Sequence, residues 1–387
     1  MTEQLRLLHT DGRPDTASVD IAAIFDPARM TQARRLAGLT KSALAAKIGI
    51  TPAAVGQWEA GTTPPRRDHL QATADILDVP ITFFAIGRPH ARLDESAAHF
   101  RSLRSTRASQ RAKAIAFVEQ VWELAYALEK RVQLPPVDLP GFSDGEISRD
   151  DLPTDPQEAA RELRRYWNLG HGPIAHLVRT METRGLLVTL IPFAGADTPC
   201  VDAFSASRLS RPIVVLAPDR ADDVYRHRFT AAHELGHLLL HSDTAPGDPL
   251  QEREANLFAA EFLTPRDAIR EDLPSRLDFV ALDQVSKAWG VSVKSLVFRS
   301  RELGLLSDAT ARRAYQRLKQ MENLGLITGD PVTNYPGEVP CLLSKAYALA
   351  ETKGLTLVTL ANELKWKLPR LRLLLGDADP RPALRLV

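Results

Sequence analysis

The sequence predicts a multidomain protein that joins an all-α N-terminal domain to an α+β domain with a small sheet and a helical C-terminal part. Three observations lead to this prediction. Thr, Pro and Gly punctuate residues 27–86 in the way that short helices begin and end. Three β-type runs, at 185–193, 201–207 and 211–218, then follow one another and precede two helical segments. Residues 341–376 again look like a small, separate helical unit.

The boundaries between these parts divide the chain into five segments. We expect an N-terminal arm at residues 1–26, an all-α domain at 27–87, a helical linker at 88–155, the α+β domain at 156–325 and a small helical C-terminal domain at 326–387. Within the linker, Ala114–Val132 carries apolar residues on one stripe, which predicts a long amphipathic helix. Such a stripe serves either as a dimer interface or as a packing surface on its own domain.

The composition is that of an ordinary globular protein. The chain has 387 residues, of which 44% are hydrophobic and 25% charged, with a formal net charge of +1. No apolar run approaches the roughly 20 residues of a membrane helix, and the N-terminus lacks the order of a signal peptide. Two cysteines far apart, Cys200 and Cys341, suit a reducing cytoplasm and argue against a structural disulfide. We therefore expect a cytoplasmic protein without a membrane partner, in which any DNA contact comes from a local basic patch.

The most specific pattern in the sequence is His-Glu-x-x-His at His233–His237, within the helix-forming run Phe229–His241. Residues four apart on a helix share a face, with Cβ atoms about 5–6 Å apart. Two imidazoles so placed can bind one Zn²⁺ at roughly 2.0–2.1 Å. Glu234 lies beside them and can take a proton from a zinc-bound water. The pattern predicts a zinc peptidase site with His233 and His237 as ligands and Glu234 as general base.

A zinc site of this kind needs a third protein ligand. His241 is unsuitable because it lies about 12 Å along a straight helix from the first histidine of the motif, so we expect it to support the site from outside. Glu252 and Asn256 are four apart on a downstream helix, which lets Glu252 bind the metal while Asn256 orients a ligand histidine. The alternatives to Glu252 are Glu254, which points to a different face, and Glu261, which lies nearer the helix end.

Residues 28–86 predict three short helices in the order of a helix-turn-helix domain. Thr40 is placed to cap the second helix, and Pro52 opens the third. The early residues of the third helix would face the major groove of DNA: Thr51, Ala53, Ala54 and Gln57. Gln57 can read adenine, whereas the alanines can touch only a thymine methyl group. The basic residues placed to hold phosphates are Lys41, Arg34, Arg35, Arg66 and Arg67.

This N-terminal pattern resembles the XRE family of Cro/repressor-type helix-turn-helix domains. The residues that carry the resemblance are Leu44, Ala45, Gly49, Val55, Trp58, Glu59, Gly61 and Pro64. Gly56 stands where the family usually has Ser, which lowers helix propensity and removes a hydroxyl group. The resemblance implies binding to a double-stranded DNA operator, with two half-sites bound by a homodimer. The alternative is a helical bundle used for protein contacts, because the reading face is small and poor in Arg.

The segment from about 159 to 325 resembles the ImmA/IrrE family of zinc-dependent endopeptidases. The matching blocks are 201–205, 211–214, 228–241, 252–265 and 289–292. One departure is Thr264, which stands where this family often has Met. The resemblance implies a gluzincin-like site with two His and one Glu, and DNA-bound repressors as typical substrates. It also implies an extended substrate strand along the active-site sheet, and we assign the edge that receives this strand to 201–207.

Together these patterns predict a zinc endopeptidase fused to its own DNA-binding domain. We expect it to cleave a repressor or another regulator in a stress or phage-related response, with activity that can be latent in the isolated protein. Two alternatives remain: a transcription regulator whose metal domain senses a ligand or metal without cleaving anything, and an antitoxin-type regulator. Glu234 favours the peptidase, because a regulator without catalysis has no need of a general base.

Overall fold

The chain is described by a computed structural model and divides into two compact units. The residues described are 21–91, 93, 98–100, 107–143, 146–148, 151–190, 203–207, 209–217, 223–242, 248–326 and 328–376. Most of the expected N-terminal arm lies outside them, as do the ends of the predicted strands at 191–193, 201–202 and 218. One unit holds Met1–Arg34 and Thr40–Arg88, and the other holds Arg35–Leu39 and Pro89–Val387.

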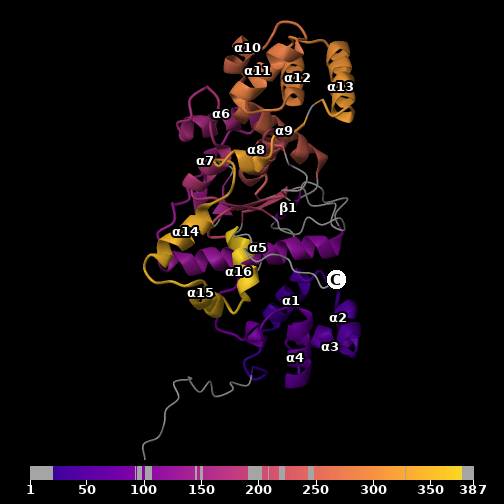
Figure 1. Cartoon of the computed structure of the whole chain (residues 1–387), viewed down its shortest axis with the longest axis vertical. Coiled ribbons are helices and arrows are strands. Elements are labelled where there is room, and N and C mark those ends of the chain that lie inside the picture. The colour runs from indigo at the N-terminus through magenta and orange to yellow at the C-terminus, as the bar shows by residue number, and fades with distance from the viewer. Residues whose placement is uncertain are drawn as a thin grey trace, which may run out of the picture. The chain divides into compact units, whose positions relative to one another are not determined.

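The first unit is all-α and is drawn in indigo in Figure 1. Its elements are α1 (Pro27–Leu36), α2 (Lys41–Ile48), α3 (Pro52–Glu59), α4 (Arg67–Ile76) and the 3-10 helix η1 (Ile81–Phe84). The hydroxyl oxygens of Thr40 and Thr51 accept hydrogen bonds from backbone N–H groups in the first turns of α2 and α3, as N-cap residues do. Gly49 ends α2 in the left-handed conformation, at φ 78°, which a glycine adopts without strain. The turn between α2 and α3 therefore follows from the local sequence.

The second unit is an α+β fold followed by further helices. Its strands are β1 (Ala98–Phe100), β2 (Phe142–Ser143), β3 (Glu146–Ile147), β4 (Leu187–Leu190), β5 (Ala203–Ala206) and β6 (Ile213–Leu216). Its helices are α5 (Ala108–Glu129), α6 (Pro156–Tyr166), α7 (Leu177–Thr183), α8 (Val224–Leu240), α9 (Pro249–Leu263), α10 (Arg266–Asp272), α11 (Phe279–Trp289), α12 (Val293–Glu302), α13 (Asp308–Asn323), η5 (Val332–Asn334), α14 (Leu342–Glu351), α15 (Leu357–Leu364) and α16 (Leu368–Leu375).

The main sheet has four strands in the order β1-β5-β6-β4. β4 and β6 are parallel, whereas β5 is antiparallel to both of its neighbours. In this register Ser205 of β5 lies opposite His99 of β1. The prediction that 201–207 forms the edge of the sheet is therefore wrong, because β1 pairs with β5 and takes the edge position. No pattern in the sequence predicts this pairing, since a three-residue strand is too short to show a periodic pattern.

Helices α8 and α9 pack closely against each other beside the sheet. Gly236, in the middle of α8, makes this contact possible. A Cβ atom at this position would lie 3.0 Å from Cδ1 of the Phe258 ring of α9. Because Gly236 has no side chain, α9 comes close enough to bring its polar residues to the face of α8 that carries His233 and His237.

The helices after residue 340 belong to the same compact unit as the sheet. α14 and α15 contact α5, and α14 also contacts β4. The Arg370 Nε donates to the Gln120 Oε1 of α5 at 2.6 Å, and the Arg131 Nη2 donates to the Glu363 Oε2 of α15 at 2.7 Å. Figure 1 shows α14 and α16 beside the long helix α5. The expected domain boundary at 326 remains a prediction. The helices that follow it pack on the preceding part of the unit, and α5 provides a surface on which α14 and α15 pack.

Candidate metal centre

Helix α8 carries the predicted zinc motif in its interior. The helix begins after Asp223, whose carboxylate accepts a hydrogen bond from Tyr225 N at 2.9 Å. His233 and Glu234 are fully buried, and His237 is 2% exposed. Buried imidazole and carboxylate groups need polar partners, because an unpartnered polar group is costly to bury. The partners of these three side chains therefore decide what the site can do.

The structure brings the three predicted ligands together. The Nε2 atoms of His233 and His237 are 3.0 Å apart. The Glu252 Oε2 lies 3.5 Å from His233 Nε2, and the Glu252 Oε1 lies 3.4 Å from His237 Nε2. Ligand atoms bound to one Zn²⁺ at roughly 2.0–2.1 Å in a tetrahedron lie about 3.3 Å from one another. Both the spacing and the donor set of two imidazoles and one carboxylate therefore fit a zinc ion.

The outward nitrogen of each candidate ligand histidine is also engaged. The His233 Nδ1 lies 3.1 Å from Asn256 Oδ1, and the His237 Nδ1 lies 3.0 Å from His241 Nδ1. The His241 Nε2 in turn lies 2.8 Å from a carboxylate oxygen of Glu254. Such contacts fix the ring orientation and leave Nε2 to face the metal. Asn256 and His241 thus lie where the sequence predicts supporting residues.

Among the three glutamates considered as third ligand, Glu252 is the one that reaches both histidines. Glu254 instead supports His241 from behind. Glu261 is buried away from the histidines and pairs with Arg299 and with Arg161. Burial alone raises the pKa of Glu252, but hydrogen bonds with the two histidines outweigh it and lower that pKa to about 2. Glu252 is therefore a carboxylate at neutral pH, as a metal ligand must be.

Glu234 is held by a contact that the sequence does not predict. The Ser205 hydroxyl, on β5, donates to Glu234 Oε2 at 3.0 Å, and both residues are fully buried. This hydrogen bond fixes the direction of the carboxylate beside the two histidines. The sequence does not single out Ser205 as a partner of Glu234, since only the packing of β5 on α8 brings these two residues together.

Comparisons with known protein families match a segment of each unit. Residues 181–301 match a peptidase family described as the IrrE N-terminal-like domain, and residues 30–84 match the family described as helix-turn-helix. The chain joins an XRE-type helix-turn-helix domain to an ImmA/IrrE-type peptidase domain. The fold class and both resemblances predicted from the sequence are thereby confirmed. No curated protein sequence matches the chain.

In the helix-turn-helix domain, most of the side chains predicted to read DNA are accessible. Thr51, Ala53, Gln57 and Arg66 are exposed, and Ala54 is half-buried at the start of α3. The Thr51 hydroxyl also caps α3, so its main contact is structural. Lys41, which we expected on a phosphate, lies 3.4 Å from Glu59, a carboxylate that also accepts from Arg34. These DNA contacts remain predictions.

Throughout the described part of the sequence, no helix is both long enough and apolar enough to cross a bilayer.

Proposed function

We propose that this protein is a DNA-binding transcription regulator whose second unit is a zinc-dependent endopeptidase. The observation that carries the proposal is the convergence of His233, His237 and Glu252 beside the buried carboxylate of Glu234. A Zn²⁺ ion held there would supply Lewis-acid chemistry, acidifying a water and polarising the scissile carbonyl. Glu234, fixed by Ser205, accepts the proton of the attacking water and returns it to the departing amine.

The helix-turn-helix domain supports a substrate that is found at DNA. A peptidase tethered to an operator has a high local concentration near other proteins bound there. We infer that the substrate is a repressor, another regulatory protein or a second copy of this chain, cleaved in a stress or phage-related response. A homodimer binding two half-sites in the cytoplasm fits this role.

The function is tested by replacing the proposed base. Glu234→Gln keeps the size of the side chain and its contact with Ser205 but removes the acceptor of the proton. We expect cleavage of a sensitive repressor by the zinc-loaded protein to fall by about 10²–10⁴-fold, while the zinc content stays at one ion per chain. Glu322→Gln, at an exposed position on α13, is the matched control and should retain full activity. Cleavage that persists in Glu234→Gln would refute the assignment of the base.

The pairing of β1 with β5 supports latency of the isolated protein. β1 pairs with β5 where the resemblance places the substrate strand. Consecutive residues of a strand direct their N–H groups to opposite sides of the strand, so one of His99 and Phe100 directs its N–H group toward β5. Replacing both residues with proline removes that N–H group, whichever of the two residues carries it. We expect this double variant to cleave a protein substrate about three- to tenfold faster than the unmodified chain, given the modest strength of one hydrogen bond. An unchanged or lower rate in a steady-state assay would show that β1 does not hold the peptidase in a latent state.

A further inference from the structure

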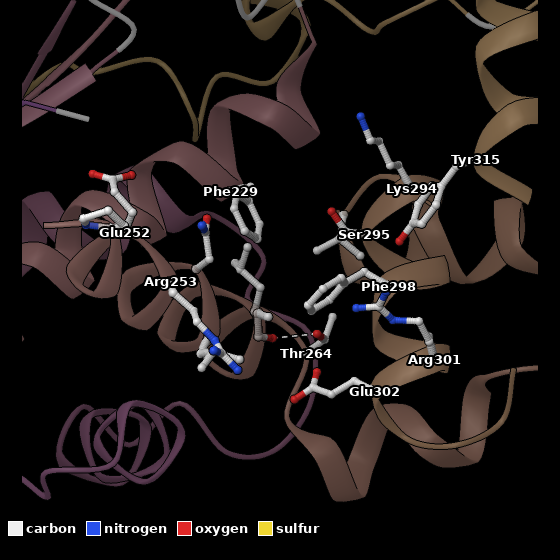
Figure 2. Close-up of a pocket in the computed structure, with 16 residues that line it drawn as sticks. Phe229, Glu252, Arg253, Thr264, Lys294, Ser295, Phe298, Arg301, Glu302 and Tyr315 are labelled. Carbon is white, nitrogen blue, oxygen red and sulfur yellow. Dashed lines mark hydrogen bonds between the residues drawn. The ribbon is translucent and has the colours of Figure 1, made fainter. Parts of the chain in front are cut away.

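A cavity of about 840 Å³ lies against α9 and α12, next to the candidate metal centre. Figure 2 shows Glu252 at one side of it and Lys294, Phe298 and Arg301 at the other. Ligand pockets in proteins span about 300–1,000 Å³, so this cavity is large enough for more than one amino-acid side chain. Its position and its chemistry indicate what it binds.

The cavity shares lining residues with the candidate metal centre. Glu252 and Asn256 both line it, and these side chains reach the two histidines. Phe229 lines it from α8, four residues before His233 and therefore on the same face of the helix. A peptide whose scissile bond lies at the metal centre would thus place a neighbouring side chain in this cavity.

The wall of the cavity is largely apolar. The residues that form this part include Phe229, Leu257, Ala260, Leu263, Val291 and Phe298. Phe298 is unusually accessible for a large apolar side chain, with 37% of its surface exposed. An apolar surface of this kind gains free energy when a large apolar side chain covers it and removes it from water.

The charged groups around the cavity are mainly cationic. Arg253, Lys294 and Arg301 line it, and the acidic lining residues are Glu252 and Glu302. Glu302 already accepts from Arg299 Nη1 at 2.6 Å, and Glu252 faces the histidines. Arg301 lies 3.8 Å from Asp308, whereas within the described part of the chain neither Lys294 nor Arg253 has an acidic side chain at ion-pair distance. The cavity therefore offers uncompensated positive charge beside an apolar wall.

We propose that this cavity is the specificity pocket of the peptidase and that it selects a large apolar residue flanked by Asp or Glu. The apolar side chain covers the wall formed by Phe229, Val291 and Phe298. Lys294 and Arg253 lie on opposite sides of the cavity (Figure 2), so each meets a different flanking carboxylate. The inference rests on the proposed function, because it takes the substrate to be a polypeptide bound at the metal centre. It adds the chemical class of the residues that the site prefers.

Peptide binding tests the pocket independently of cleavage. The probes are three fluorescein-labelled peptides that differ only in a central Phe-Glu-Glu, Phe-Lys-Lys or Ala-Glu-Glu, measured by anisotropy on the full-length zinc-loaded Glu234→Gln chain. We expect Phe-Glu-Glu to bind about tenfold more tightly than Phe-Lys-Lys, since each exposed ion pair contributes about two- to fivefold. We also expect Ala-Glu-Glu to bind at least tenfold more weakly, because the buried aromatic ring is lost. Equal affinities, or no binding at all, would overturn the proposal.

Charge reversal locates the preference in the cavity. Lys294→Glu should abolish the preference for Phe-Glu-Glu over Phe-Lys-Lys, whereas Lys319→Glu, at an exposed position on α13 that does not line the cavity, should leave it intact. Both variants make the same change in net charge, so equal effects would exclude a local role for Lys294.

Cleavage of the same peptides by the chain with Glu234 intact separates the two proposals. Selective binding without cleavage contradicts the peptidase function alone, and cleavage without selectivity contradicts the pocket alone.

Discussion

Two buried polar clusters lie along helix α8, and they differ in how their charged and polar groups are paired. In the first, Arg228 is 3% exposed and Glu338 is 1% exposed, and the two side chains form an ion pair. The remaining Arg228 donors bind the backbone oxygens of Ile174 at 2.6 Å and Gly290 at 2.8 Å. In the second, the candidate metal centre, two histidine nitrogens and one carboxylate converge on a single point. In the first cluster the positive and negative side chains pair with each other. In the second, the ligand atoms are arranged so that a bound cation would pair with them.

This difference shows that a buried charge does not by itself indicate a functional site. Glu338 and Glu252 are both glutamates that lie against α8. Glu338 also accepts from the backbone N–H groups of Leu177 and Val178, at 2.9 and 3.1 Å, so it joins the start of α7 to α8. Its role is to hold elements of the fold together. Glu252 is half-buried at the border of a cavity and faces histidines, and its geometry is that of a ligand.

The largest effect on stability is expected from breaking the complete cluster. Arg228→Met leaves the Glu338 carboxylate buried without its cation, which costs about 3–5 kcal/mol. We expect this loss in the free energy of unfolding, measured by chemical denaturation in the presence of a chelator. The matched control Arg226→Met changes an exposed arginine of the same helix and should alter stability by no more than about 0.5 kcal/mol.

A second substitution separates the ion pair from other effects of the missing guanidinium. The double variant Arg228→Met/Glu338→Gln carries no buried charge and should recover part of the lost stability. If the double variant is less stable than Arg228→Met alone, the carboxylate is not the source of the penalty, and the contrast between the two clusters would fail.

The two clusters also differ in how far the sequence predicts them. His233, Glu234 and His237 lie within one helical turn or so, and Glu252 and Asn256 share a face of the next helix, so helical geometry predicts which residues of each helix lie together. The caps Thr40 and Thr51 are local in the same way. By contrast, Glu338 is 110 residues from Arg228, and Ser205 is 29 residues from Glu234. No local periodicity links such residues, because tertiary packing alone brings them together.

The smaller effect is expected at the metal centre, where a supporting contact is removed without leaving a buried charge. Asn256→Ala frees the His233 Nδ1 from its 3.1 Å contact, so the ring no longer has a fixed orientation toward the metal. We expect Zn²⁺ affinity to fall by about 10–100-fold in a chelator competition, as for other supporting residues of zinc sites. The stability of the metal-free protein should change by less than about 1 kcal/mol, because Asn256 is only half-buried.

Asn323→Ala, at an exposed position on α13, is the control and should leave both quantities unchanged. The two substitutions together then sharpen the comparison. Arg228→Met should lower the free energy of unfolding whether or not zinc is present. Asn256→Ala should lower it only when zinc is present, because weaker zinc binding stabilises the folded state less. An Asn256→Ala variant that binds zinc normally but unfolds easily without it would show that the metal centre, like the Arg228–Glu338 pair, stabilises the fold through its protein contacts alone.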